Sequence, residues 1–141
     1  MKKKLLFLIG VLLIVMSAGC SNDNDEFSLC NTWILVSYVN ESNEVLKEAN
    51  GYIYKITFNS DGTYSGLAYG NEMGGKYKCK GNWIQFISRD ITQKYVVGSD
   101  PDKFFLEHLA GVCLYTITDA ELKLFYSKDQ YFKFRTINSL K

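Results

Sequence analysis

The sequence predicts an α+β protein that is mainly β: a curved antiparallel sheet or partly closed barrel of seven to eight strands, with one α-helix at about residues 101–110. Three observations predict this class. Hydrophobic residues make up 47% of the 141 residues and charged residues 22%, which is typical of a globular chain. From Thr32 onward, β-branched and aromatic residues come in short runs. Gly, Asn and Asp separate these runs, and only one helical pattern interrupts them.

Two kinds of hydrophobic pattern define the expected strands. Residues 32–39 form a nearly continuous apolar run, which indicates a buried strand, whereas residues 52–58 alternate between two faces. Polar residues 40–50 predict a loop, and residues 59–62 and Gly81-Asn82 predict turns. The expected strands cover residues 32–39, 52–58, 63–69, 76–80, 83–87, 112–118, 121–126 and 131–135.

One segment carries helical signals. Asp100 can cap a helix, Pro101 suits a first turn, and Gly111 fits just past the end. Phe104, Phe105 and Leu109 follow helical spacing. Because short turns join the strands, we expect antiparallel pairing and a helix that covers an open end of the barrel.

The first residues are typical of a secretory signal peptide. Three lysines at 2–4 precede an apolar run at 5–16, and small residues at 17–19 lead to Cys20. The run is shorter than the ~20 residues that a transmembrane helix needs. Ser17-Ala18-Gly19-Cys20 resembles the lipobox of bacterial lipoproteins, in which the cysteine is acylated and becomes the first residue, although Leu is usual where Ser17 stands.

These features divide the chain into three parts. Residues 1–19 are expected to be a lipoprotein signal peptide, residues 20–29 a lipidated Cys20 with an acidic flexible tether, and residues 30–137 the β-rich domain. Removal of the leader takes away three lysines, which leaves 13 basic and 15 acidic side chains, so no nucleic-acid partner is expected. An acidic tract after the lipidated cysteine also resembles a surface-export signal. The expected location is the outer membrane. The sequence does not decide whether the protein lies on the inner face or on the cell surface.

Several marks in the domain resemble the META domain of the HslJ-like heat-shock lipoproteins. Trp33 begins a Trp-x-Leu strand, and an Asn-x-x-x-Gly-x-Tyr segment is present as Asn71, Gly75 and Tyr77. A Val-x-x-Tyr-x-Ile strand follows the helix from Val112. The chain departs from the family where Gly70 and the region of Val96 stand in place of two cysteines. The resemblance implies an antiparallel β structure with a helix and a location in the cell envelope. It implies little chemistry, because the family has no agreed catalytic site.

Three cysteines other than Cys20 remain, and an odd count allows one internal disulfide at most. Cys30 is expected to pair with either Cys79 or Cys113; the alternative is three buried, reduced thiols. No Cys-x-x-Cys pair is present, so no metal site is expected.

Other polar residues are interpreted as structural. His108 is the only histidine and flanks the apolar stripe of the predicted helix, and we expect solvent or backbone to satisfy it at the boundary between core and surface. Glu107, Asp119 and Glu121 lie at helix and turn positions that are ordinarily solvated. The sequence therefore predicts no enzyme, no catalytic residue and no cofactor.

Two further features have alternative interpretations. The Gly-rich residues 70–75 lack the Lys-Ser/Thr of a phosphate-binding loop and are expected to form a flexible turn. Five tyrosines either form a binding surface or pack on neighbouring strands, and packing is favoured. They are Tyr52, Tyr54, Tyr64, Tyr69 and Tyr77.

Three functional hypotheses follow from these observations. The first is a non-enzymatic, membrane-anchored envelope lipoprotein that binds a protein or has a role in envelope stress. The second is a lipocalin-like carrier that encloses a small apolar ligand. The third is an inhibitor that presents residues 70–75 to a partner enzyme. The interior of the barrel, filled or hollow, should distinguish the second hypothesis from the others.

Overall fold

The computed structural model describes residues 28–41, 44–46, 54–68, 70–92, 100–118 and 120–137. The signal peptide, the lipobox with Cys20 and residues 21–27 of the tether lie outside these ranges, as do Tyr52, Tyr69 and Asp119. The secondary-structure elements are β1 (Thr32–Val39), β2 (Glu44–Leu46), β3 (Lys55–Phe58), β4 (Thr63–Ala68), β5 (Asn71–Lys80), β6 (Trp83–Phe86), β7 (Asp90–Ile91), α1 (Asp100–Leu109), β8 (Leu114–Thr118), β9 (Glu121–Phe125) and β10 (Tyr131–Thr136).

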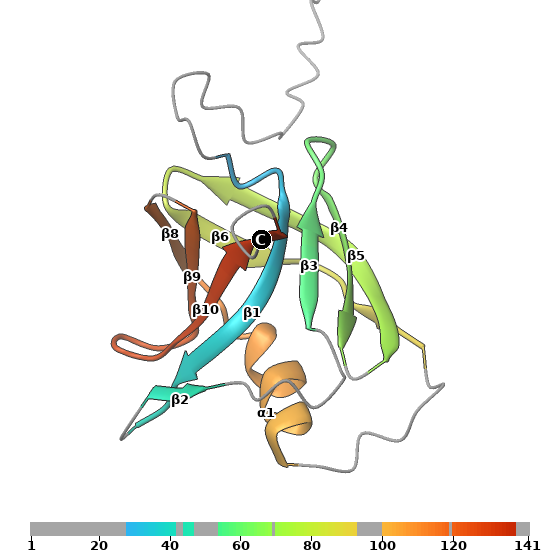
Figure 1. Ribbon diagram of the computed structural model, residues 1–141. Helices are drawn as coiled ribbons and strands as arrows, with labels where there is room; N and C mark the ends of the chain where they lie inside the picture. The colour runs from blue at the N-terminus through green and yellow to red at the C-terminus, as the bar shows by residue number, and fades with distance from the viewer. Residues whose placement is uncertain are drawn as a thin grey trace, which may run out of the picture.

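Eight of the strands close into an antiparallel barrel with one helix at an end (Figure 1). The order around the barrel is β1-β3-β4-β5-β6-β8-β9-β10, and β10 pairs with β1 to complete the ring. Outside the ring, β2 pairs with β1 and β7 pairs with β5. The predicted class, a mainly β barrel with one helix, is confirmed. Closure leaves the strands of the ring without an open sheet edge.

Local sequence explains the turns that join these strands. In the β3–β4 turn, Asp61 Oδ1 accepts hydrogen bonds from the backbone N of Thr63 at 2.9 Å and from its Oγ1 at 2.6 Å. These bonds lower the pKa of Asp61. Gly62 has a φ of 81° and Gly81, in the β5–β6 hairpin, a φ of 58°, a region that favours glycine. Both turns were expected from the sequence.

Three segments differ from the sequence-based predictions. Residues 44–46, expected in a loop, form the short strand β2 beside β1. Residues 71–75, expected in a flexible turn, belong to β5, and only Gly70 remains in the turn, with a φ of 74°. The short strand β7 was not expected at all. In each case the pairing partner, which local sequence does not reveal, determines the structure.

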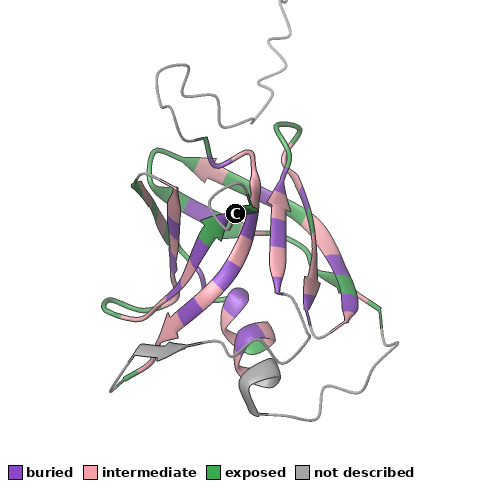
Figure 2. Cartoon of the chain, viewed as in Figure 1, coloured by how far each residue is buried: buried purple, intermediate pink, exposed green. Residues whose placement is uncertain are grey.

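The buried residues of the strands and the helix form one hydrophobic core cluster, and Figure 2 shows where they lie along the chain. Along β1 the buried residues alternate, so that Trp33 and Leu35 point inward while their neighbours are half-buried. The same alternation places the side chains of Leu122 and Leu124 on β9 and Phe132 and Phe134 on β10 inside. Leu29 is also part of this cluster, so the folded domain begins before Cys30.

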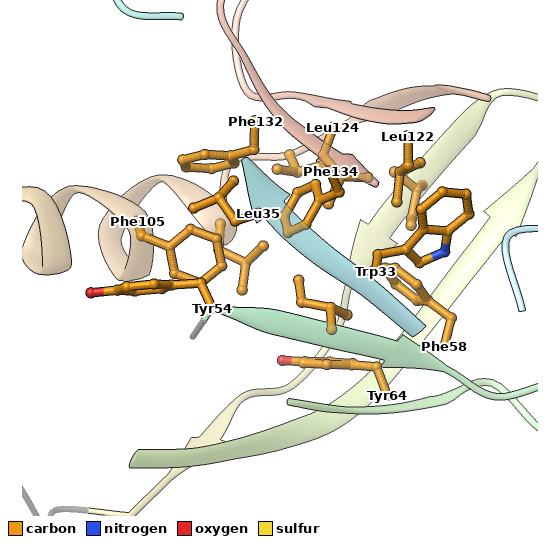
Figure 3. Packing of buried hydrophobic residues seen from close by; sticks show 14 of the residues in the cluster. Trp33, Leu35, Tyr54, Phe58, Tyr64, Phe105, Leu122, Leu124, Phe132 and Phe134 are labelled. Atoms are coloured by element: carbon orange, nitrogen blue, oxygen red, sulfur yellow. The ribbon is translucent and has the colours of Figure 1, made fainter. Parts of the chain in front are cut away.

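Helix α1 covers the lower end of the barrel in Figure 1. Phe105 is 2% exposed and lies edge-on to Tyr54 and Phe132, with ring centroids 5.2 Å and 5.0 Å apart (Figure 3). Leu109 is buried one turn later, while Glu107 is exposed on the opposite side. The amphipathic pattern of the helix thus positions an aromatic plug at this end.

Candidate functional site

The residues that carry the META resemblance have structural roles in the barrel. Trp33 is completely buried, and its Nε1 donates a hydrogen bond to the carbonyl oxygen of Leu29 at 2.9 Å. Asn71 is 1% exposed at the start of β5. A Cβ atom on Gly75 would lie 2.0 Å from the carbonyl oxygen of Ser88, so a glycine is required where these two backbones approach.

Tyr77, the fourth of these residues, links three segments at the upper end of the barrel. Its ring is buried against Phe58, with centroids 5.0 Å apart. Its Oη donates to the carbonyl oxygen of Asn59 at 2.8 Å and lies 3.8 Å from Cys30 Sγ. Burial raises the pKa of Tyr77, and the contact with Cys30 raises it further. The neutral hydroxyl is therefore the form that this environment favours.

The cysteine contacts differ from the expected disulfide. Cys30 and Cys113 are both free, so Cys30 is paired with neither Cys79 nor Cys113. The Cys30 thiol instead contacts the hydroxyl of Tyr77. Cys113 is exposed between α1 and β8, and Cys79 packs against the core from the inward face of β5. Neither of the two expected Cys30 disulfides is formed in this structure, and the alternative of three buried thiols does not hold either, because Cys113 is exposed.

His108 is satisfied by its own helix. Its Nδ1 lies 2.9 Å from the carbonyl oxygen of Phe104, one turn earlier, and its ring stacks on Phe104 at a centroid distance of 4.0 Å. Tyr126 packs edge-on against the same ring at 5.0 Å. This is the backbone-satisfied boundary histidine that the sequence predicted, and its contacts are those of a packing residue.

The carboxylates are dispersed in the described part of the chain. Glu107 is exposed on α1, and Glu121 forms a surface ion pair with Lys123 at 3.7 Å. No group of three or more His, Cys, Asp or Glu side chains within the described ranges could hold a metal ion. No described helix is long and apolar enough to cross a bilayer.

The tyrosines on β4 and β5, and the one just before β3, are buried in the core instead of forming a surface. Tyr54, Tyr64 and Tyr77 are each 2% exposed. The Oη of Tyr64 donates to the carbonyl oxygen of Ser88 at 2.9 Å, and burial raises the pKa of Tyr64 to about 12. The favoured interpretation, packing on neighbouring strands, is therefore correct for these three.

Large side chains occupy the centre of the barrel, where a carrier would hold its ligand (Figure 3). Trp33, Phe58, Phe105, Phe132 and Phe134 come from β1, β3, α1 and β10 and are all 2% exposed or less. An eight-stranded barrel is wide enough either to be filled by side chains or to hold one small ligand, and here large side chains lie in its interior. Residues 71–75 lie in β5, so the loop that an inhibitor was expected to present is a paired strand.

The outer surface has an exposed apolar pair beside lysines, which was not predicted from the sequence. Trp83 on β6 and Leu114 on β8 are 41% and 42% exposed and are directly paired. On the side of β6 away from β8, Trp83 is paired with Lys80 of β5. Lys76 and Lys78 are also exposed on β5. Directly paired residues share one face of a sheet. In the sequence, lysines alternate with Tyr77 and Cys79 along residues 76–80, and this alternation could have predicted a lysine-bearing outer face on the strand.

Neither a protein-family model nor a curated protein sequence matches this chain. Three solved structures share its fold. An NMR structure of a protein from Burkholderia xenovorans has a TM-score of 0.64 at 13% identity, with 76% of this chain and 81% of that chain covered. A crystal structure of a DUF4847 family protein from Bacteroides vulgatus has a TM-score of 0.57 at 20% identity, with 75% and 92% covered.

The third structure, also determined by NMR, has a TM-score of 0.60 at 16% identity and covers 79% of this chain and 93% of that chain. Similarity at these identities concerns the fold alone. The fold and the described surface define a small, closed antiparallel β-barrel with a helix at one end, large buried side chains in its interior and an exposed apolar pair beside lysines.

Proposed function

We propose that this protein is a non-enzymatic lipoprotein of a bacterial outer membrane, which is held by acyl chains on Cys20 and presents a META-like barrel for binding. The observation that carries the proposal is the structural use of the polar residues. Tyr77 bonds the backbone of Asn59, His108 bonds the backbone of Phe104, and the described carboxylates are dispersed. Such contacts stabilise a scaffold and arrange no nucleophile with a base.

The leader supports the anchored form of the proposal. Lys2-Lys3-Lys4, the apolar run and Ser17-Ala18-Gly19-Cys20 have the order of a lipoprotein signal. Leu29 is already in the core, so a short polar segment joins Cys20 to the barrel. Two or more acyl chains would hold the mature chain on the membrane stably.

Metabolic labelling tests the anchor. The full-length chain is expressed in a Gram-negative host with an alkyne analogue of palmitate, and the mature protein is recovered for mass spectrometry. We expect labelled protein that begins at Cys20. Cys20→Ala should remove the label and leave residues 1–19 attached, whereas Cys30→Ala, the matched control, should be labelled and cut normally. A parent chain that keeps Met1 or carries no fatty acid would refute the proposal.

The acidic residues 23, 25 and 26 support exposure on the cell surface. Protease treatment of intact cells tests this part separately. A surface-exposed barrel should be cut at accessible positions while a periplasmic marker stays intact. Full protection of the barrel, with cleavage only after lysis, would place it on the inner face of the membrane.

The binding role is tested by recovery of a partner. Intact cells are crosslinked, and the tagged protein is purified from solubilised envelope beside a tagged, unrelated lipoprotein as the control. A protein enriched with this barrel and absent from the control would support the proposal. Repeated failure to recover a specific partner would count against the binding role but not against the anchor.

A further inference from the structure

The upper end of the barrel is the end through which the chain leaves for the N-terminal segment. Cys30 Sγ lies 3.8 Å from Tyr77 Oη, and the backbone N of Phe58 bonds the carbonyl oxygen of Asn31. Residues 28–31 therefore lie beside β5 and the β3–β4 turn. In Figure 1 this end is opposite α1 and also bears the start of β6.

The same end carries the exposed apolar pair and the lysines. Lys80 is three residues beyond Tyr77 and opposite Trp83, and Leu114 lies opposite Trp83 on the next strand. The outward face of β5 adds Lys76 and Lys78. The acidic groups associated with this end are Asp61 in the β3–β4 turn and, in the sequence just before Ser28, residues 23, 25 and 26, whereas the outward face of β5 itself carries three lysines. This local positive charge contrasts with the net charge of −2 left when residues 1–19 are removed.

We propose that this face, made of Lys76, Lys78, Lys80, Trp83 and Leu114, rests on the membrane and binds anionic lipid headgroups. The inference goes beyond the proposed function and rests on it for the anchor at Cys20. Seven residues separate Cys20 from Ser28, so eight residue-to-residue steps join them. An extended chain gains at most ~3.6 Å per step, so the anchor keeps this end within about 29 Å of the bilayer.

The chemistry of the face suits a lipid surface. Tryptophan favours the boundary between headgroups and acyl chains, because its ring is apolar and its N–H can bond water or lipid. Lysine can bury its methylene stem along an apolar surface while its ammonium reaches a phosphate. Anionic lipid attracts lysines close to the membrane, and the attraction decays within a Debye length. An anchored barrel that contacts the bilayer through this face would bring these lysines within that range.

Tryptophan fluorescence can test the contact, because the two tryptophans differ fully in exposure. Trp33 is 0% and Trp83 41% exposed, so iodide quenching in solution reports Trp83. The mature lipidated protein is reconstituted into phosphatidylcholine vesicles with or without phosphatidylglycerol. We expect that phosphatidylglycerol removes the quenching of Trp83 and shifts its emission to shorter wavelength, and that high salt restores the quenching.

Two variants complete the experiment. Lys78→Gln combined with Lys80→Gln should leave Trp83 quenched on anionic vesicles, and Trp83→Phe should remove the difference between vesicles altogether. Vesicle flotation is measured in parallel. A chain that does not float with phosphatidylcholine vesicles would refute the anchor. A chain that floats, but whose Trp83 is quenched equally on both vesicles, would overturn this inference and leave the anchor intact. If Trp83 were protected from iodide only after envelope extract is added, the face would bind a protein and not lipid. That result would also overturn this inference.

Discussion

The indole of Trp33 holds the N-terminal end of the described chain against the barrel. Its Nε1 donates to the carbonyl oxygen of Leu29 at 2.9 Å, and both side chains are buried. The bond therefore links the segment before β1 to the start of the β1–β10 pairing, where Trp33 lies opposite Thr136.

Trp33→Phe should lower the free energy of unfolding by about 2–3 kcal/mol. The substitution leaves the carbonyl of Leu29 without its donor in a buried site, and it removes ring volume from the core. Urea unfolding followed by circular dichroism measures the loss. Trp83→Phe is the control and should change stability by less than about 0.5 kcal/mol, since Trp83 is largely exposed. Equal effects of the two variants would contradict this role of Trp33.

Phe105→Ala should destabilise the protein by about 3–5 kcal/mol, which is typical of a buried phenylalanine. Phe105 fills the end of the barrel against Tyr54 and Phe132, and alanine would leave a cavity there. Glu107→Ala on the same helix is the matched control, because Glu107 is exposed. Thermal unfolding of both variants is compared. Both place alanine in α1, so a larger loss in Phe105→Ala reports the loss of the buried ring and not a change in helix propensity. A small effect of Phe105→Ala would show that α1 does not close the barrel in solution.

Gly75→Ala and Gly81→Ala should differ because they meet different obstacles. A Cβ at Gly75 would collide with the backbone of Ser88, which should cost about 3 kcal/mol or more. At Gly81 nothing lies within 4 Å, and only the φ of +58° opposes alanine, at a cost of about 1–2 kcal/mol. Chemical denaturation gives both values. The close approach at Gly75 would be disproved if Gly81→Ala were the more damaging substitution.

The barrel should lose stability in alkaline solution as pH rises from about 10 to about 12. An unfolded tyrosine deprotonates at about pH 10, whereas burial raises the pKa of Tyr64 and of Tyr126 to about 12. Above pH 10 the unfolded chain has released protons that the folded chain still binds. The contribution is thus complete below pH 10 and disappears as pH rises through the folded pKa.

Tyr64→Phe tests this dependence at one residue. It should cost about 1 kcal/mol at neutral pH, since the bond to the Ser88 carbonyl is lost. Between pH 10 and 12 its stability should decline less steeply than that of the parent chain. Urea unfolding at several pH values measures both slopes, and parallel curves would be evidence against a raised pKa at Tyr64.

Cys113 should react with maleimide faster than Cys30 in the folded protein. Cys113 is exposed, while Cys30 is half-buried and contacts Tyr77 Oη. Brief labelling followed by peptide mass spectrometry gives the modified fraction at each position. Cys113→Ser should remove the fast reaction and leave the slow labelling of Cys30 unchanged. Preferential labelling of Cys30 would contradict the described placement of residues 28–31.

Local patterns predicted the elements that local chemistry determines. The apolar run at 32–39 matches β1, and the signals at Asp100, Pro101 and Gly111 bracket α1, which covers Asp100–Leu109. Contacts distant in sequence were not predictable in this way. Gly75 suggested a flexible loop, yet it permits β5 to approach Ser88, and residues 44–46 become a strand only because β1 lies beside them.

The same distinction applies to the candidate site. The alternation in β5 could have shown that Lys76, Lys78 and Lys80 share a face, because alternate residues point the same way. It could not show that Leu114, across the pairing of β6 and β8, continues that face beside Trp83. The fate of Cys30 was equally hidden, since its contact with Tyr77 spans 47 residues of sequence.

The pairing of β1 with β10 also constrains how the protein is made. The ring cannot close until residues 131–136 have been synthesised, by which time β1 has waited, with one edge unpaired, for about one hundred residues. Such long-range pairings slow folding. A nascent β1 is rich in β-branched and aromatic side chains and would aggregate readily during that interval. Closure of the ring is therefore expected to be the slow step in the folding of this topology.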